Sequence, residues 1–191
     1  MECPAEFLLS AARPDQFPAE TLPEVAFLGR SNVGKSTLLN CLTGQKELAF
    51  SSSTPGRTQA VNFFRVDGKI ILVDLPGYGY ATAPRQLSRV WGQTAEAYLL
   101  ERRSLRLCVL LVDARRGWME PDLQLKEWLE FRARPYVVVA TKVDKLNQKE
   151  RHQSRIAMRE HYPLADLIWF SAVNGQGVKE LWQAISKTTG H

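Results

Sequence analysis

The run GRSNVGKS at residues 29–36 constrains this chain more than any other feature, because it is a complete G-x-x-x-x-G-K-[ST] loop. It follows an apolar run at residues 25–28 and precedes a helical pattern that contains Leu38, Leu39 and Leu42. Its glycines let the backbone curl so that successive N–H groups point at phosphate oxygens, and the following helix adds partial positive charge. The sequence therefore predicts a nucleoside triphosphate site but does not yet select the base.

Two side chains of this loop carry the expected chemistry. Lys35 supplies a full positive charge to the phosphates, and the Ser36 hydroxyl can ligate Mg²⁺. The flanking strand and helix patterns weaken the alternative of a chance match to the motif. The loop residues expected to contact the nucleotide are Gly29, Arg30, Ser31, Asn32, Val33, Gly34, Lys35, Ser36 and Thr37.

Strand-like and helix-like patterns alternate along the chain, and Asp67-Gly68 between two strand-like runs indicates a hairpin because that turn needs positive φ. Strands are expected at residues 25–28, 62–66, 70–74, 107–112, 136–140 and 167–170. Helical faces are formed by Leu87, Val90, Trp91 and Thr94, by Leu125, Trp128 and Leu129, and by Val178, Leu181, Trp182 and Ile185. The alternation predicts an α/β three-layer sandwich with a mostly parallel six-stranded sheet, one antiparallel strand and about five helices.

Composition narrows the class of protein. The chain has 191 residues, of which 45% are hydrophobic, and no apolar run or leader has the length of a membrane span or secretory signal. Residues 1–20 carry three prolines and are expected to form an extended arm on a single domain of residues 21–191. Three cysteines at unrelated spacings favour a reducing compartment, expected to be the cytoplasm, over a disulfide framework or zinc site. A net charge of +5 permits a nucleic-acid partner.

A second motif, D-x-x-G, starts at Asp74 directly after an apolar run. A carboxylate at that position can hold Mg²⁺ through water, and Gly77 lets a backbone N–H approach the γ-phosphate. Alone, the motif would be an ordinary turn. Its place after a strand, 39 residues beyond Lys35, favours a phosphate and metal site.

The segment TKVD, from Thr141 to Asp144, selects the base. Asp144 can accept hydrogen bonds from guanine N1–H and the exocyclic amine together, and a buried acceptor left unpaired rejects the wrong base. The aliphatic stem of Lys142 can lie along the base face. Ser171 and Ala172, after the last strand, would complete the pocket with a backbone N–H to the guanine carbonyl.

Residues 53–58, STPGRT, form a candidate switch between the first helix and the hairpin. A threonine here can bring its hydroxyl to Mg²⁺ and its N–H to the γ-phosphate only while that phosphate is present. From the residues alone, either Thr54 or Thr58 could take this role, with Gly56 and Arg57 beside it as further expected nucleotide contacts. A loop that is merely mobile is the alternative interpretation.

Together, the strings GRSNVGKSTLLN, STPGRTQ followed by NFF, DLPGYGYA, TKVDK and FSAVNGQGVKELW resemble the EngB family (also called YihA or YsxC) of bacterial GTPases. The resemblance spans about residues 5–185. It implies that Thr58 rather than Thr54 contacts the nucleotide and joins Ser36 as a metal ligand. It implies a Ras-like P-loop GTPase fold in a monomeric cytoplasmic enzyme that binds GTP and GDP with Mg²⁺. It further implies a role in assembly of the large ribosomal subunit, with ribosomal RNA and proteins of its precursor as partners.

Two positions depart from the general Ras-like pattern. Thr141 stands where many GTPases carry asparagine, although threonine is usual in the EngB family, so we expect a somewhat weaker brace of the pocket rather than lost specificity. Tyr78 follows Gly77 where Ras-like enzymes carry the glutamine that orients the attacking water. We therefore expect slow intrinsic hydrolysis that needs a partner, and no residue is assigned as catalytic.

Two side chains are candidate helpers of hydrolysis. Asn32 occupies the loop position where related Era-like and TrmE-like GTPases hold a potassium ion, which would neutralise developing charge. The alternative is that Asn32 only tolerates the backbone conformation of the loop. Arg57 could reach a phosphate, but a solvated loop arginine is favoured.

Two groups of arginines exceed what a nucleotide needs. Arg151, Arg155 and Arg159 recur every four residues on a helix expected over residues 149–161, so they share one face. The second group comprises Arg102, Arg103, Arg106, Arg115 and Arg116. Phosphates of ribosomal RNA would bind such faces by counterion release, whereas a solvated surface balanced by acidic neighbours is the alternative. The family resemblance favours RNA contact.

Three other functions fit parts of the sequence. A GTP- or GDP-binding interaction module with negligible turnover and a non-ribosomal partner is kept open by the missing glutamine. An adenylate-type kinase is disfavoured by Asp144 and by the lack of an arginine-rich lid. A membrane-associated GTPase is disfavoured because no lipidation signal is present. The leading prediction is a GTPase whose hydrolysis resets a conformation that a ribosomal particle reads.

Overall fold

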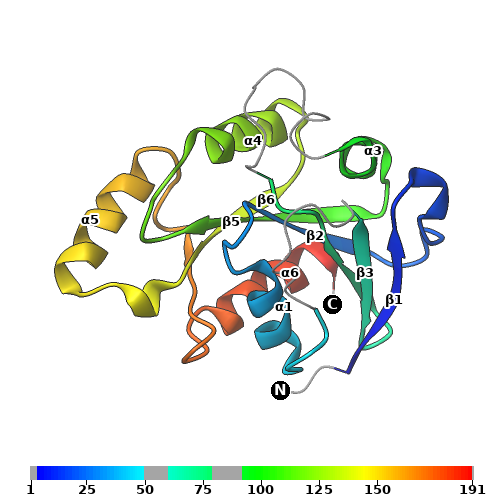
Figure 1. Ribbon diagram of the computed structural model, residues 1–191, viewed down its shortest axis with the longest axis horizontal. Coiled ribbons are helices and arrows are strands. Elements are labelled where there is room, and N and C mark those ends of the chain that lie inside the picture. The colour runs from blue at the N-terminus through cyan, green and yellow to red at the C-terminus, as the bar shows by residue number, and fades with distance from the viewer. Residues whose placement is uncertain (1–3, 50–59, 79–91, 191) are drawn as a thin grey trace.

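The computed structural model describes residues 4–49, 60–78 and 92–190, in which helices cover both faces of one seven-stranded sheet (Figure 1). The strands are β1 (Ala5–Ala11), β2 (Glu24–Gly29), β3 (Val61–Val66), β4 (Ile70–Asp74), β5 (Leu105–Asp113), β6 (Tyr136–Thr141) and β7 (Ile168–Trp169). The helices are α1 (Lys35–Thr43), α3 (Gln93–Glu101), α4 (Glu120–Phe131), α5 (Gln148–Arg159) and α6 (Val178–Thr189), with 3-10 turns at Pro14–Gln16 and Val143–Lys145. The predicted α/β sandwich is confirmed.

The strands follow the order β1-β3-β4-β2-β5-β6-β7. Strand β3 runs antiparallel to both of its neighbours, whereas β4, β2, β5, β6 and β7 pair in parallel. Because β2 lies between β4 and β5, the loops that follow these three strands open at one edge of the sheet. In open α/β sheets this carboxyl edge is where ligands bind.

Side chains alternate across the sheet and build a core on each face. On β2, Ala26 and Leu28 join the cluster that α3 and α4 cover, and Val25 and Phe27 join the cluster that α1 and α6 cover. Figure 1 shows these two helix pairs on opposite sides of the sheet. A strand buried on both faces requires a continuous apolar run, which explains the sequence of β2.

The sheet has seven strands rather than the expected six, because part of the expected arm at residues 1–20 forms β1. This edge strand pairs antiparallel with β3, from Ala5 opposite Val66 to Ala11 opposite Val61. Its side chains are mostly exposed or half-buried, and Phe7 packs edge-on against Phe64 with ring centroids 5.7 Å apart. The apolar run at residues 7–9 is only three residues long and lies close to Pro4 and Pro14, so the sequence pattern did not reveal this strand.

A buried ion pair ties the start of β2 to the segment after α3. Arg102 contacts the fully buried Glu24 with a 2.6 Å nitrogen–oxygen distance, and the Tyr98 hydroxyl donates to the same carboxylate at 2.8 Å. The Arg102 guanidinium also lies 5.8 Å from the ring centroids of Phe17 and Phe63. Arg102 is therefore part of the core and not of a basic RNA-binding face, which corrects the sequence-based grouping.

Most of the expected helices are present. The faces built from Leu125 and from Leu181 lie on α4 and α6, and the arginine-bearing helix is α5. Of the remaining face, Thr94 belongs to α3, and Leu87, Val90 and Trp91 lie outside the described residues. None of the helices in the described parts of the chain combines the length and apolarity needed to cross a bilayer.

Candidate functional site

The phosphate loop leaves β2 at Gly29 and enters α1 at Lys35 with a tightly curled backbone. Asn32 and Gly34 take positive φ values of 63° and 105°, a region that glycine and asparagine adopt more readily than other residues. A Cβ on Gly29 would lie 2.6 Å from Cγ1 of Val33, so the loop closes on itself too tightly for a larger residue. The residues of the motif thus produce the backbone shape that a phosphate cradle requires.

Lys35 and Asp74 form a direct ion pair across the carboxyl edge of the sheet. Both side chains are about nine-tenths buried, with exposures of 11% and 9%. Ser36 and Thr37 follow in the first turn of α1. The residues that the two motifs assign to phosphate and to magnesium therefore lie side by side, and a bound phosphate would compete with Asp74 for the Lys35 ammonium.

The segment that follows β4 pairs with the phosphate loop. The Tyr78 N–H donates to the Gly29 carbonyl at 3.3 Å, and the Ser31 N–H donates to the Tyr78 carbonyl at 3.0 Å. A Cβ on Gly77 would lie 2.8 Å from Oγ and 2.9 Å from the backbone nitrogen of Ser31. Gly77 is therefore required for this close approach.

The Tyr78 side chain points into the core, where it meets α4. Its hydroxyl donates to Oδ1 of Asp122 at 2.9 Å, and Nε of Arg30 lies 3.5 Å from Oδ2 of the same carboxylate. Burial, together with the Asp122 charge, raises the pKa of Tyr78 well above its usual value. Tyr78 is 2% exposed, so its hydroxyl lies in the core beside Asp122 and not at the surface of the site.

Thr141 joins the expected base-binding loop to the phosphate loop. Its Oγ1 donates to the Val33 carbonyl at 2.8 Å, and Thr141 is 2% exposed. A buried carbonyl without a donor costs about 1–3 kcal/mol, so this single hydroxyl makes a substantial contact. Thr141 therefore braces the pocket through a hydrogen bond of ordinary length.

Lys142 extends this connection and brings in a carboxylate that the sequence motifs did not identify. Its Nζ donates to the Asn32 carbonyl at 2.6 Å and to Oδ2 of Asp113 at 3.0 Å. Burial opposes ionisation of Asp113, but hydrogen bonds from Arg115 and Lys142 outweigh it and hold the pKa of this carboxyl at about 2. Asp113 is the last residue of β5. A carboxylate at the carboxyl end of a buried strand is the sequence signal that could have identified it as a site residue.

Asp144 and Ser171 meet at the outer side of the same edge. The Ser171 hydroxyl donates to Oδ1 of Asp144 at 2.8 Å, which fixes the carboxylate orientation. The Val143 N–H donates to the Phe170 carbonyl at 3.3 Å and holds the two loops together. Ala172 follows directly and packs against the core cluster under α6. The structure thus brings together the residues that sequence assigned to guanine recognition.

The remaining predicted positions are only partly placed. Gly56, Arg57 and Thr58 lie outside the described residues, so the structure does not test the expected switch or its metal ligand. Among the residues that are described, no group of three His, Cys, Asp or Glu side chains gathers to hold a metal. Magnesium in nucleotide sites needs only one or two protein ligands besides substrate phosphates. Ser36, which follows Lys35 in the chain, and Asp74, which contacts Lys35, suit that mode.

The two arginine groups differ in their surroundings. Arg151, Arg155 and Arg159 are exposed on α5, as expected. In the second group, Arg103, Arg106, Arg115 and Arg116 are all exposed, but Arg115 is ion-paired to Asp113 at 2.7 Å. Together with the burial of Arg102, this pairing leaves α5 as the more coherent basic face.

Comparison with known proteins matches these features to GTP-binding proteins. A family model described as "50S ribosome-binding GTPase" matches residues 24–142. A protein of Solibacter usitatus (strain Ellin6076) named "Probable GTP-binding protein EngB" is 56% identical over 184 residues, which cover 96% of this chain and 95% of the relative. The family-model match includes the phosphate loop, Asp74 and the first two residues of the TKVD segment.

Two solved structures extend the similarity to three dimensions. The crystal structure of a probable GTP-binding protein engB has a TM-score of 0.64 and 26% identity, and covers 87% of this chain and 98% of that one. The second has a TM-score of 0.62 and 25% identity, and covers 87% of this chain and 56% of that one. It shows Era in complex with MgGDPNP and nucleotides 1506–1542 of 16S ribosomal RNA.

Proposed function

This chain belongs to the EngB family of GTP-binding proteins and is a GTPase, and we propose that it acts as a nucleotide-dependent switch in assembly of the large ribosomal subunit. The proposed partners are GTP, GDP and a precursor particle with its ribosomal RNA and proteins. The protein would work as a single domain, as a monomer and in the cytoplasm. The description of the matching family model supports a ribosomal partner.

The observation that carries the switch is the pairing of Gly77 and Tyr78 with the phosphate loop. Gly77 follows the carboxylate that contacts Lys35, so a γ-phosphate bound at the loop would meet its backbone. The hydrogen bond from Tyr78 to Asp122 then links any displacement of this segment to α4. A conformational change at the phosphates would therefore be transmitted to α4.

Magnesium supplies charge neutralisation at the β- and γ-phosphates when it is bound. Ser36 and Thr58 are the proposed direct ligands, and Asp74 is the proposed partner through water. Lys35 would exchange its contact with Asp74 for the phosphates. Titration of GDP and a non-hydrolysable GTP analogue with and without chelator tests this assignment. In Asp74→Asn the dependence of analogue affinity on magnesium should weaken, because the water-mediated contact to the ion is lost.

Intrinsic hydrolysis is proposed to be slow, because the buried Tyr78 occupies the position of the water-orienting glutamine. Asn32 remains the proposed potassium ligand. The potassium role is tested by measuring phosphate release in potassium and in sodium, for the wild type and for Asn32→Gly. This variant can keep the positive φ of residue 32 but lacks the amide side chain. Equal rates in both salts for the wild type would remove the potassium role.

The ribosomal role is tested by co-sedimentation with purified large-subunit particles in GDP or in a non-hydrolysable GTP analogue, at low and moderate salt. Binding that needs the analogue and survives moderate salt supports the proposal. Asp144→Asn is the matched control, because its particle binding should respond to xanthosine analogues instead of guanosine ones. Binding that ignores the nucleotide and disappears with salt would reduce the interaction to nonspecific RNA attraction.

A GTP-binding module with negligible turnover is the competing function, since Tyr78 gives hydrolysis no side chain to orient water. Phosphate release measured with and without the particles separates the two. Stimulation by particles supports the switch, and an absence of turnover under both conditions supports the module.

A further inference from the structure

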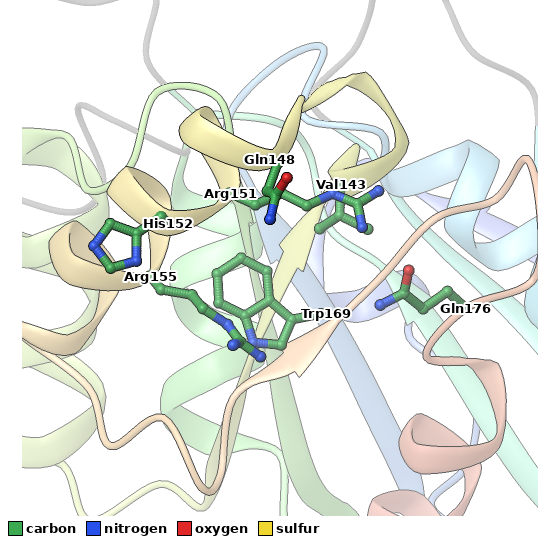
Figure 2. Close-up of a pocket in the computed structure, with 7 residues that line it drawn as sticks. All are labelled: Val143, Gln148, Arg151, His152, Arg155, Trp169 and Gln176. Atoms are coloured by element: carbon green, nitrogen blue, oxygen red, sulfur yellow. The ribbon is translucent and has the colours of Figure 1, made fainter.

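A cavity of about 380 Å³ lies between α5 and β7 and is also lined by Val143 of the TKVD segment. Gln148, Arg151, His152 and Arg155 line it from α5, Trp169 from β7 and Gln176 from the loop before α6. In Figure 2 the Trp169 ring lies below Gln148 and Arg151, with the Arg155 side chain along its lower left edge and Gln176 on the opposite side. This volume falls in the range of ordinary ligand sites.

The cavity combines positive charge with an aromatic face. Helix α5 carries Lys149, Arg151, Arg155 and Arg159 against one acidic residue, Glu150. The guanidinium carbon of Arg155 lies 5.7 Å from the centroid of the half-buried Trp169 ring. Aromatic rings and arginine planes are the surfaces on which unstacked RNA bases stack, and arginines bind the adjoining phosphates.

The cavity arginines are available for an anion. Within the described parts of the chain, neither Arg151 nor Arg155 forms an ion pair, in contrast to Arg102 and Arg115. Nε of Arg151 donates to the Leu146 carbonyl at 3.2 Å, which orients the guanidinium and leaves its terminal nitrogens for a ligand. A charged face that lacks its own counterions is complementary to a polyanion.

We propose that this cavity binds one unstacked nucleotide of single-stranded RNA, an inference that rests on the proposed ribosomal function. The base stacks on Trp169 beside the Arg155 guanidinium, and Arg151 contacts an adjoining phosphate. Gln148 and Gln176 offer amide donors and acceptors to the base edge.

The RNA site shares its supporting loops with the guanine site. Val143 lines the cavity and stands between Lys142 and Asp144. The backbone of Gln176 accepts a hydrogen bond from the Ser171 N–H at 3.0 Å, and Ser171 follows Trp169 by two residues. The two ligands would therefore bind on opposite sides of the same pair of loops.

Two charge-matched double variants test the site with a fluorescent single-stranded oligoribonucleotide. Arg151→Ala/Arg155→Ala and Arg103→Ala/Arg106→Ala each remove two exposed positive charges, but only the first pair lines the cavity. The first variant should lose roughly tenfold or more in affinity and the second less than about threefold. GDP affinity and the unfolding midpoint of each variant establish that it is folded. Equal losses in the two variants would overturn the proposal.

The stacking contact is tested with an abasic oligomer of the same length. The wild type should bind the base-bearing oligomer roughly tenfold more tightly than the abasic one. Trp169→Leu should remove this preference, whereas Trp169→Phe should keep it, because phenylalanine retains an aromatic face. Equal affinity of the wild type for both oligomers, or tighter binding of a peptide rich in aspartate and glutamate, would refute an RNA base site.

Particle binding separates failure of this inference from failure of the proposed function. If the wild type co-sediments with large-subunit particles and Arg151→Ala/Arg155→Ala co-sediments equally well, the cavity assignment is wrong and the ribosomal role stands. If the wild type does not co-sediment in any nucleotide state, the ribosomal role fails whatever the oligomers show. If Arg151→Ala/Arg155→Ala loses particle binding while the wild type and Arg103→Ala/Arg106→Ala keep it, both the ribosomal role and the RNA site are supported.

Discussion

The hydroxyl of Tyr78 donates a 2.9 Å hydrogen bond to the carboxylate of Asp122, and both side chains are almost completely buried. Tyr78 directly follows the D-x-x-G motif, and Asp122 lies in the first turn of α4. Burial raises the pKa of Asp122 although Tyr78 and Arg30 oppose that shift. The contact therefore connects the phosphate loop, the segment after β4 and a helix at the surface through one buried polar group.

Tyr78→Phe removes this hydrogen bond while keeping the ring. Because the bond reaches a buried carboxyl group, we expect a loss of about 1.5–3 kcal/mol in the free energy of unfolding by urea. Tyr136→Phe is the matched control, since its hydroxyl donates to the half-exposed Glu130 at 2.6 Å and should contribute less than about 1 kcal/mol. Equal losses in the two variants would contradict a special role for the buried bond.

Asp144→Asn changes which base the pocket accepts. The carboxamide offers one acceptor in place of two and turns a donor toward the guanine amine, so GDP affinity should fall by about 100-fold or more. Xanthosine diphosphate carries a carbonyl where guanine has its amine and should regain much of that loss. Competition against fluorescent GDP measures both affinities. Ser171→Ala removes only the hydrogen bond to the Asp144 carboxylate, so it should weaken GDP binding without favouring xanthosine diphosphate. A preference for xanthosine diphosphate in both variants would contradict the assignment.

Asp113 gives the stability of the protein a defined pH dependence. Its pKa of about 2 lies below the ordinary value of 3.8, so its contribution is complete above pH 5 and is lost as the pH falls toward 2. Asp113→Asn should cost roughly 2 kcal/mol at neutral pH, and this difference from the wild type should shrink to about half near pH 3. Urea unfolding of the nucleotide-free proteins at several pH values measures it. A difference that does not change with pH would show that Asp113 acts by packing alone.

Arg102 and Arg103 are neighbours in sequence with opposite surroundings. Arg102→Met leaves the buried Glu24 carboxylate without its cation, so we expect a loss of about 3–5 kcal/mol in the free energy of unfolding. Arg103→Met changes an exposed side chain and should alter stability by less than about 0.5 kcal/mol. Adding Glu24→Gln to Arg102→Met should restore part of the loss. Similar costs for the two single variants would contradict the buried ion pair.

The convergence of the nucleotide-binding motifs at one edge of the sheet could be predicted because each motif is a local signal placed by a regular fold. The loop at residues 29–36, Asp74 and Asp144 each follow a strand whose apolar run is visible in the sequence. Parallel strands carry their carboxyl ends to one edge, so three distant motifs are expected to converge without any knowledge of individual contacts. The contact between Lys35 and Asp74 follows from this geometry.

Contacts that depend on burial were decided only by the tertiary structure. In the sequence, Arg102 cannot be distinguished from the exposed arginines near it. Only the structure shows that Glu24, 78 positions earlier, lies beside it in the core. The pairing of β1 with β3 depends on backbone hydrogen bonds, which leave little trace in the side chains of a half-exposed edge strand.

By itself, then, the amino-acid sequence determined the α/β fold, the phosphate loop and the preference for guanine, because a local pattern of residue types predicts each of them. The tertiary structure decided which polar side chains are buried, which charges are already paired and where α5 leaves a basic cavity beside Trp169. Those properties depend on which distant residues pack together, since a charge binds an external partner only where the fold has not already neutralised it.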